Sequence, residues 1–539
     1  MRTLPSILSL AAALFMAESL AAADGLLPPN QPIEQVVDQY LDARLKEEGI
    51  TPAGPADDTN FIRRLTLDLA GRIPTVEETK AFVASTKPGK RLELVERLMN
   101  SPAFVRHQAT EFDVMLMNGT RASVRAYLLT ALAEKRSWDR IYRELMLPDE
   151  QDAKQKPASE FLRQRVRDLD KLTAEVSSIF FGVNVSCARC HDHPLVHDWK
   201  QDHFFGMKSF FSRTYESGGH LAEREFGVVK FKTTKGVERQ ARLMFLTGKV
   251  IETATLKEPP GGEKKSKKGR KDGSKNAPPP APPQFSARTQ LVNLSLEPGQ
   301  RDFFARSIVN RLWHRLFGYG LVMPLDQMHS ENPPSHPDLL DWLARDMVEH
   351  HYDIRRLIHG LVLSRAYARD SRWEKGDAPR ASLFAVARVK PLTPMQLAVA
   401  LRLAVNDPNG LPANLKPEEF DKRLQGLESG AGGMARLFEQ PGDDFQVGVS
   451  EALLFSNSDR IRKELLSDGG DRLLGRLKQL KNPDEIVDLA MRTILSRPPH
   501  DEERKLLGDY LKQRADRAAE AQRQLVWALL TSTEFRFNY

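Results

Sequence analysis

The hydrophobic positions of this chain recur mainly at intervals of three and four residues. That spacing places apolar side chains on one face of an α-helix. The clearest stripes are Ile33, Val36, Val37, Tyr40 and Leu41; Ile62, Leu65 and Leu69; Phe304, Ile308, Leu312 and Leu316; and Ile354, Leu357, Ile358, Leu361 and Val362. Because such stripes occur along most of the chain, we predict a mainly α fold.

Residues with strong end preferences bound several of these predicted helices. Gly71 follows the stripe that ends at Leu69, and glycine suits the left-handed conformation after a helix. Thr75 and Glu78 have the spacing of a capping box, which predicts a helix start. Pro337 and the pair Asn482-Pro483 likewise predict helix starts, since proline is favoured in the first helical turn.

The pattern changes in the middle of the chain. Residues 226–234 and 243–247 are rich in Val, Phe and Thr, which favours short strands. Residues 257–287 are rich in Lys, Gly and Pro, which is typical of a linker without a core. We therefore predict two helical modules separated by a small β excursion and a low-complexity linker. The expected organisation is a signal peptide (1–23), a helical module (24–215), a β segment (216–256), a linker (257–287) and a second helical module (288–539).

The N-terminus has the layout of a secretory signal peptide. Arg2 precedes an apolar run from Leu4 to Phe15, and an A-x-A site predicts cleavage after Ala23. An uncleaved membrane anchor is the alternative, although the run is short for a transmembrane helix. We expect a mature protein without a transmembrane segment, exported to the periplasm or cell envelope or secreted.

The composition is that of a globular protein, with 41% hydrophobic and 28% charged residues. Most of the formal net charge of +7 comes from residues 257–275, which hold eight Lys or Arg and three acids. This basic run contains no aromatic residue. A basic run can contact nucleic acid or an anionic surface. Because it lies among Gly and Pro, we interpret it as a solvated linker and expect no nucleic-acid partner.

The two cysteines of the chain, Cys187 and Cys190, both lie in the pentapeptide 187–191, followed directly by His191. C-x-x-C-H is the attachment signature of c-type haem, with two thioether-forming thiols and a histidine for the iron. We therefore predict covalent haem at Cys187 and Cys190 with His191 as proximal ligand. Candidate sixth ligands are His197, His203 and Met207, with Met323 or Met328 of the second module as alternatives; His193 is too close in sequence to reach the opposite face.

Three other interpretations stay open. The cysteines could bind zinc together with His191, His193, His197 or His203. They could instead form a Cys187–Cys190 disulfide. Separately, the loop 326–336 holds Asp326, His329, Glu331, Asn332 and His336. It is either a turn with polar caps before a helix or the wall of a hydrolase site.

Several segments are similar to two known domains. Residues 61–75 resemble the opening of the DUF1549 domain, and residues 187–194, with Trp199 and 204–206, resemble its cytochrome-like end. Residues 310–313, 317–322, 332–337, 495–499, 527–530 and 534–535 resemble the DUF1553 domain. The resemblance implies a planctomycete-type protein regarded as cytochrome-like because of C-x-x-C-H. Since this chain has one such motif, any electron-transfer partner would be another molecule. A zinc-binding or cell-envelope and polysaccharide-associated interaction protein is the alternative class.

Overall fold

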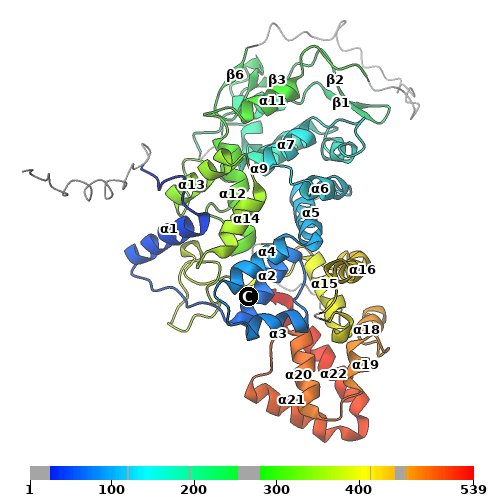
Figure 1. Ribbon diagram of the computed structural model, residues 1–539. Helices are drawn as coiled ribbons and strands as arrows, with labels where there is room; N and C mark the ends of the chain where they lie inside the picture. Colours follow the sequence, from blue (N-terminus) through cyan, green and yellow to red (C-terminus); the bar gives the residue numbers. More distant parts are fainter. Residues whose placement is uncertain are drawn as a thin grey trace, which may run out of the picture.

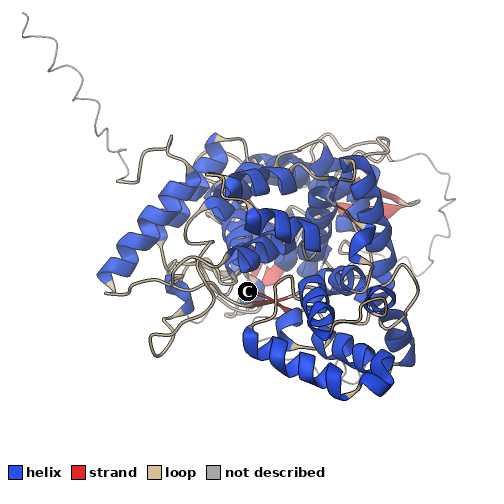
Figure 2. Cartoon of the chain, turned by 60° about the horizontal axis from the view of Figure 1, so that its bottom comes forward, coloured by secondary structure: helices blue, strands red, loops and turns tan. Residues whose placement is uncertain are grey.

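The computed structural model describes residues 25–117, 120–192, 196–252, 280–412, 414–442, 455 and 458–539. Helices make up most of these residues, and the strands are short (Figure 2). The predicted mainly α fold is therefore confirmed. The predicted signal peptide, the last residues of the predicted β segment (253–256) and residues 257–279 of the predicted linker lie outside the described residues. In the part of the chain that is described, no helix is both long and apolar enough to cross a membrane.

The first half of the chain is a series of helices that precedes the β excursion (Figure 1). These helices are α1 (Ile33–Glu47), α2 (Asp58–Ala70), α3 (Val76–Ala84), α4 (Lys90–Met99), α5 (Pro102–Met117), α6 (Arg125–Ala133), α7 (Trp138–Met146), η1 (Lys156–Ser159), α8 (Glu160–Arg163), α9 (Leu169–Phe181), η2 (Ser186–Arg189) and α10 (Gln201–Ser209).

The second half continues with helices up to the C-terminus. They are α11 (Ala287–Ser295), α12 (Asp302–Phe317), α13 (Pro337–Glu349), α14 (Ile354–Leu363), η3 (Ala381–Leu383), α15 (Pro394–Ala404), η4 (Pro408–Gly410), α16 (Pro417–Ala435), α18 (Asp459–Leu465), α19 (Leu473–Leu477), α20 (Pro483–Ile494), α21 (Asp501–Gln513), η5 (Ala515–Arg517), α22 (Ala518–Leu530) and α23 (Thr533–Arg536). Strand β7 (Lys390–Pro391) pairs antiparallel with β8 (Phe537–Asn538), which ties the C-terminus to the middle of the chain.

The predicted helix ends are formed by the expected side chains. Gly71 ends α2 with φ 68°, a left-handed conformation that glycine adopts without a Cβ penalty. Thr75 and Glu78 form the predicted capping box at the start of α3. Asn482 caps α20 by accepting a hydrogen bond from the backbone N–H of Asp484. Local sequence therefore determines these boundaries.

The β excursion consists of three two-stranded antiparallel hairpins. Their strands are β1 (Thr214–Ser217) with β2 (His220–Glu223), β3 (Lys230–Lys232) with β4 (Glu238–Gln240), and β5 (Leu243–Met244) with β6 (Val250–Ile251). The predicted strands at 226–234 and 243–247 are shorter than expected because each pairs with one short partner. The hairpin β1–β2 was missed, although Gly218 and Gly219, both at positive φ, are a hairpin-turn signal.

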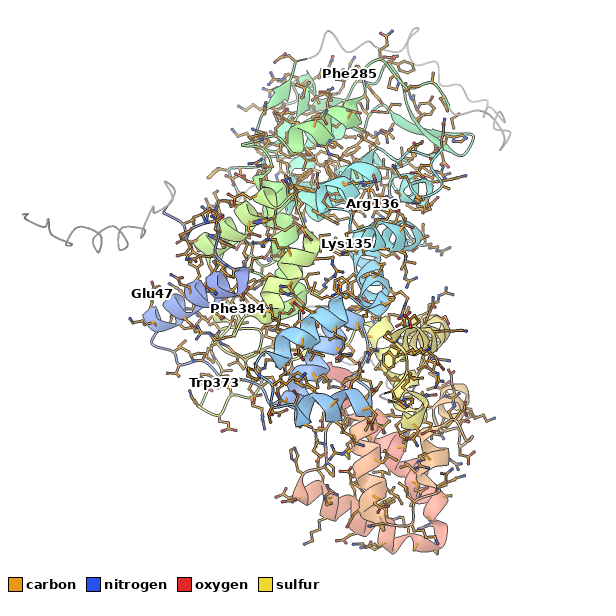
Figure 3. The ribbon with its side chains drawn as sticks, viewed as in Figure 1. Glu47, Lys135, Arg136, Phe285, Trp373 and Phe384 are labelled. Atoms are coloured by element: carbon orange, nitrogen blue, oxygen red, sulfur yellow. The ribbon has the colours of Figure 1, made fainter. Side chains whose placement is uncertain are left out.

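The hydrophobic core does not divide at the predicted linker. A large core combines helices from both predicted modules, from Ile33 of α1 to Phe384, which is labelled in Figure 3. A second core contains Leu67 and Ile73 together with apolar residues between Leu392 and Phe535. The two sequence modules are thus packed into one body, and the C-terminal helices α18–α22 extend from it (Figure 1).

Candidate functional site

The segment before the C-x-x-C-H motif is fastened to the second module. Gly182, at φ 66°, ends α9. The next residues pair with the loop after α12. The backbone N–H of Asn184 donates to the carbonyl oxygen of Asp326 at 2.7 Å. The backbone N–H of Met328 donates to the carbonyl oxygen of Gly182 at 3.0 Å. The Asn184 side chain also donates to the Asp326 carboxylate at 3.1 Å. These contacts fix the start of the motif relative to both modules.

The segment after the motif is fastened to α10. The backbone N–H of Gln201 donates to the Asp192 carboxylate at 2.9 Å, and its side chain donates to the carbonyl oxygen of Cys190 at 3.2 Å. Residues 193–195, which include His193, lie outside the described residues. The motif is therefore a short surface segment held at both ends.

The two thiols lie on one turn and face solvent. Cys187 and Cys190 are free and exposed, and the backbone N–H of Cys190 donates to the carbonyl oxygen of Cys187 at 3.3 Å in the turn η2. Between them, Ala188 is fully buried and anchors the turn in the large core. A hydrogen bond to Cys190 is the main cause that raises the pKa of Arg189, so a permanent cation stands beside this thiol. Both thiols are accessible to a reaction partner.

His191 is held in the tautomer that a metal ligand needs. Its ring is exposed, and Nδ1 lies 2.8 Å from the carbonyl oxygen of Asp192. A carbonyl oxygen can only accept, so Nδ1 carries the proton and Nε2 keeps its lone pair. Histidines that ligate metals commonly donate their other N–H in this way. The residues present therefore fit the binding of c-type haem at Cys187, Cys190 and His191.

The three candidate sixth ligands have different environments. His197 is exposed. His203 is half-buried, and its Nδ1 accepts a hydrogen bond from the backbone N–H of Lys200 at 3.1 Å. Since Nδ1 accepts this hydrogen bond, the ring proton lies on Nε2. Burial lowers the pKa of His203, which favours the neutral ring. Met207 is fully buried in the large core. Of the two alternatives in the second module, Met328 packs against Gly182.

The described part of the chain offers no preformed site for another metal. Among these residues, no group of three or more His, Cys, Asp or Glu side chains is arranged to hold a metal ion. His193, a candidate zinc ligand, lies outside this part of the chain.

The loop 326–336 uses its polar side chains to hold its own shape. The Asn332 amide donates to the carbonyl oxygens of Gln327 at 2.8 Å and Met323 at 3.2 Å. Asp326 accepts from Asn184, and Asp198 accepts twice from Ser330. These contacts favour the interpretation as a turn with polar caps, because Asp326 and Asn332 are engaged in structural hydrogen bonds.

A buried polar cluster, which the sequence analysis missed, joins distant parts of the chain around Asp68. The Asp68 carboxylate accepts from Lys390 Nζ at 2.9 Å, from the Tyr367 hydroxyl at 2.8 Å and from the Asn538 side chain at 2.8 Å. Lys390 Nζ also donates to the carbonyl oxygens of Arg315 and Leu316 at the end of α12. Lysine at a helix C-terminus is electrostatically favourable. This Asp68 cluster therefore connects α2, α12, β7 and β8.

His107 and Glu111 of α5 lie beside the Asp68 cluster and line a small cavity of about 60 Å³ with it. Burial, followed by the charge of Arg315, lowers the pKa of His107 to about 3. Burial raises the pKa of Glu111 and lowers that of Lys390. Sequence periodicity gives no sign of this site, because its members come from α2, α5, α12, β7 and β8, which are separate in the sequence.

The neutral state of His107 makes stability depend on pH. An unfolded histidine has a pKa near 6.5, so below that pH the unfolded chain binds a proton that folded His107 does not. Stability is therefore lost as the pH falls from about 6.5 towards 3. We expect His107→Gln to reduce the loss of unfolding free energy between pH 7 and pH 5 by about 2 kcal/mol. Urea unfolding at the two pH values measures this difference in unfolding free energy. The same loss in His107→Gln as in the unmodified chain would contradict the assignment. Substitution of an exposed histidine, His351→Asn, is the control.

Family models for two domains match the chain. Residues 36–216 match a family described as protein of unknown function (DUF1549), and residues 287–421 match one described as protein of unknown function (DUF1553). The DUF1549 match contains Cys187, Cys190 and His191. Searches of curated proteins and of solved structures returned no match.

The fold and the site define a mainly helical protein of two joined domains, with an exposed C-x-x-C-H segment near the end of the first. The chain carries a DUF1549 domain followed by a DUF1553 domain.

Proposed function

We propose that this protein is exported, binds one c-type haem through Cys187, Cys190 and His191, and uses it for electron transfer. Bound haem supplies a one-electron redox centre. The proposal rests on the accessibility of the two thiols and on the hydrogen bond of the His191 ring. Two free thiols lie on one exposed turn, and the hydrogen bond to Asp192 leaves His191 Nε2 available for iron.

The position of the motif also indicates how electrons would be exchanged. The thiols, His191 and the neighbouring Lys200 are exposed at the molecular surface. A redox group held at this surface could be approached closely by a partner protein. A short distance between the two redox groups favours electron transfer. Because the sequence has a single C-x-x-C-H motif, we infer that the electron donor and acceptor are other molecules.

The proposed function is tested by reversible redox change of the isolated protein. The full chain is produced in a bacterial host with a cytochrome-maturation system, and its absorption spectrum is recorded after oxidation with ferricyanide and reduction with dithionite. We expect a Soret band that shifts reversibly between the two states. A protein without a Soret band would contradict the haem assignment, and a band that does not respond to either reagent would contradict electron transfer.

The environments of the candidate sixth ligands lead to a separate prediction. His197 has an exposed side chain, whereas Met207 is packed in the core and the neutral His203 ring has its proton on Nε2. We therefore propose His197 as the sixth ligand and expect His197→Ala to convert the ferric spectrum from low spin to high spin. His203→Gln and Met207→Leu are expected to leave it low spin. The same conversion in either of those variants, but not in His197→Ala, would contradict the assignment.

A further inference from the structure

A cleft of about 840 Å³ lies away from the cysteine motif, between two helix pairs. Helices α5 and α6 form one side, and α15 and α16 form the other; Figure 1 shows the two pairs facing each other. Arg355, near the start of α14, also contributes to the lining. Its volume lies within the range of sites that enclose small organic ligands, about 300–1,000 Å³.

The walls of the cleft are mainly aliphatic. None of the described residues that line it is Phe, Tyr or Trp, and the imidazole of buried His107 is the single aromatic ring among them, so the lining offers little surface for stacking a planar ligand. Flexible aliphatic side chains instead suit an alkyl chain, which binds through buried apolar area. These side chains are Met99, Val105, Leu129, Leu132, Met395 and Val399.

Three cations line the same cleft, and among the described residues none of them forms an ion pair within 4 Å of a carboxylate. Arg125 donates to the Thr110 hydroxyl at 2.9 Å, and Arg355 donates to the Asn100 side chain at 3.2 Å, so both contact neutral groups. Lys135 follows α6 and is exposed (Figure 3). Asp113 and Asp353 interact electrostatically with Arg125 and Arg355, but the lining of the cleft itself holds more cations than acids.

A fourth cation has a structural role. Arg106 of α5 forms bidentate hydrogen bonds with the carboxylates of Asp421 and Glu428, both on α16. Arginine pairs of this kind fix geometry as well as charge. Arg106 therefore holds α16 against α5, and the acidic lining residue Glu428 is neutralised by it.

Glycine on α16 keeps part of the cleft open. Gly432 lines the cleft, and a Cβ atom added there would meet no atom within 4 Å. Glycine weakens a helix relative to alanine. Since no packing constraint requires glycine at this position, the space in front of Gly432 is part of the binding volume. Gly433 also has open space but does not line the cleft, so it offers a matched control.

We propose that this cleft binds an aliphatic anion, that is, an alkyl chain with a carboxylate or similar acidic head group. The head group contacts Arg125 at the start of α6, and the chain lies along the aliphatic walls. Lys135, after the end of α6, and Arg355 add positive charge to the cleft. Charge-assisted hydrogen bonds from arginine give the head group its preference. The site is independent of haem attachment, because its lining residues and the motif residues do not overlap.

Calorimetric titration of the full chain with octanoate tests the proposal. 1-Octanol has the same chain without the charge, and butyrate has the charge with a short chain. We expect octanoate to bind at one site and both analogues to bind at least tenfold more weakly. Failure of octanoate to bind, or equal binding of octanol, would overturn the proposal; equal binding of butyrate would show that the walls do not contribute and would overturn it as well.

Two substitutions locate the binding. Arg125→Gln is expected to weaken octanoate binding about tenfold without changing octanol binding, which corresponds to the loss of one charged contact. Gly432→Leu is expected to block octanoate by filling the cleft, whereas Gly433→Leu, with the same change in helix propensity, leaves binding intact. Octanoate binding that survives in Gly432→Leu with an unchanged affinity would place the ligand elsewhere and overturn the assignment.

Discussion

Replacement of both Cys187 and Cys190 by serine is expected to give a folded protein without covalently bound haem. The two thiols are free and exposed on the turn η2, so their removal costs little stability. Serine cannot form the thioether bonds that hold c-type haem. Haem staining after denaturing electrophoresis distinguishes covalent from dissociable haem. We expect a stained band for the unmodified chain and none for the double variant.

A neighbouring substitution serves as the control for this experiment. Ser186 lies in the same turn, and its backbone N–H donates a hydrogen bond to the Asn184 side-chain oxygen at 3.1 Å. Because Ser186→Ala keeps that N–H and both thiols, we expect its haem stain to match the unmodified chain. A stained band in the double serine variant would mean that haem is attached elsewhere and would refute the assignment of the motif.

Lys390→Met is expected to destabilise the protein by about 3–5 kcal/mol, because it removes the cation that is hydrogen-bonded to a buried carboxylate. Lys390 Nζ contacts both Asp68 carboxylate oxygens at 2.9 Å and two carbonyl oxygens at the end of α12. Tyr367 and Asn538 still donate to Asp68 in the variant, but neither carries charge. Urea unfolding followed by circular dichroism measures the loss.

An exposed ion pair provides the matched comparison for Lys390. Lys249 Nζ lies 2.7 Å from the Glu297 carboxylate, yet about half of each side chain is exposed. Surface pairs of this kind contribute about 0–1 kcal/mol, so Lys249→Met should have a small effect. Asp68→Asn combined with Lys390→Met should recover part of the stability, since it removes the unpaired charge. Equal losses of unfolding free energy in Lys390→Met and Lys249→Met would show that the Asp68 cluster does not stabilise the packing of the elements that it connects.

The sequence predicts helices well where local side chains decide the outcome. The stop at Gly71, the capping box of Thr75 and the start at Asn482 all depend on contacts within a few residues. How the helices pack is a different question, because an apolar stripe shows that a face is buried but not which element covers it. The two predicted modules consequently share one large core, which no stripe indicates.

The same distinction applies to the candidate sites. The haem motif is contiguous, so its three residues can be found in the sequence, whereas the tautomer of His191 depends on the folded position of the Asp192 carbonyl oxygen. The burial of Met207 could have been expected, because it shares a helical stripe with Phe204 and Phe211. The cleft joins α5 and α16, which are about three hundred residues apart, and neither helix alone has a recognisable motif.

The most direct test of the central claim is the intact mass of the mature chain purified from a maturation-competent host. The account predicts a chain that begins at Asp24 and is heavier than its sequence by the mass of one haem, with fragmentation placing the addition on the peptide that contains Cys187 and Cys190. A mature chain with the mass of its sequence alone, from a host that attaches haem to a control cytochrome, would contradict it.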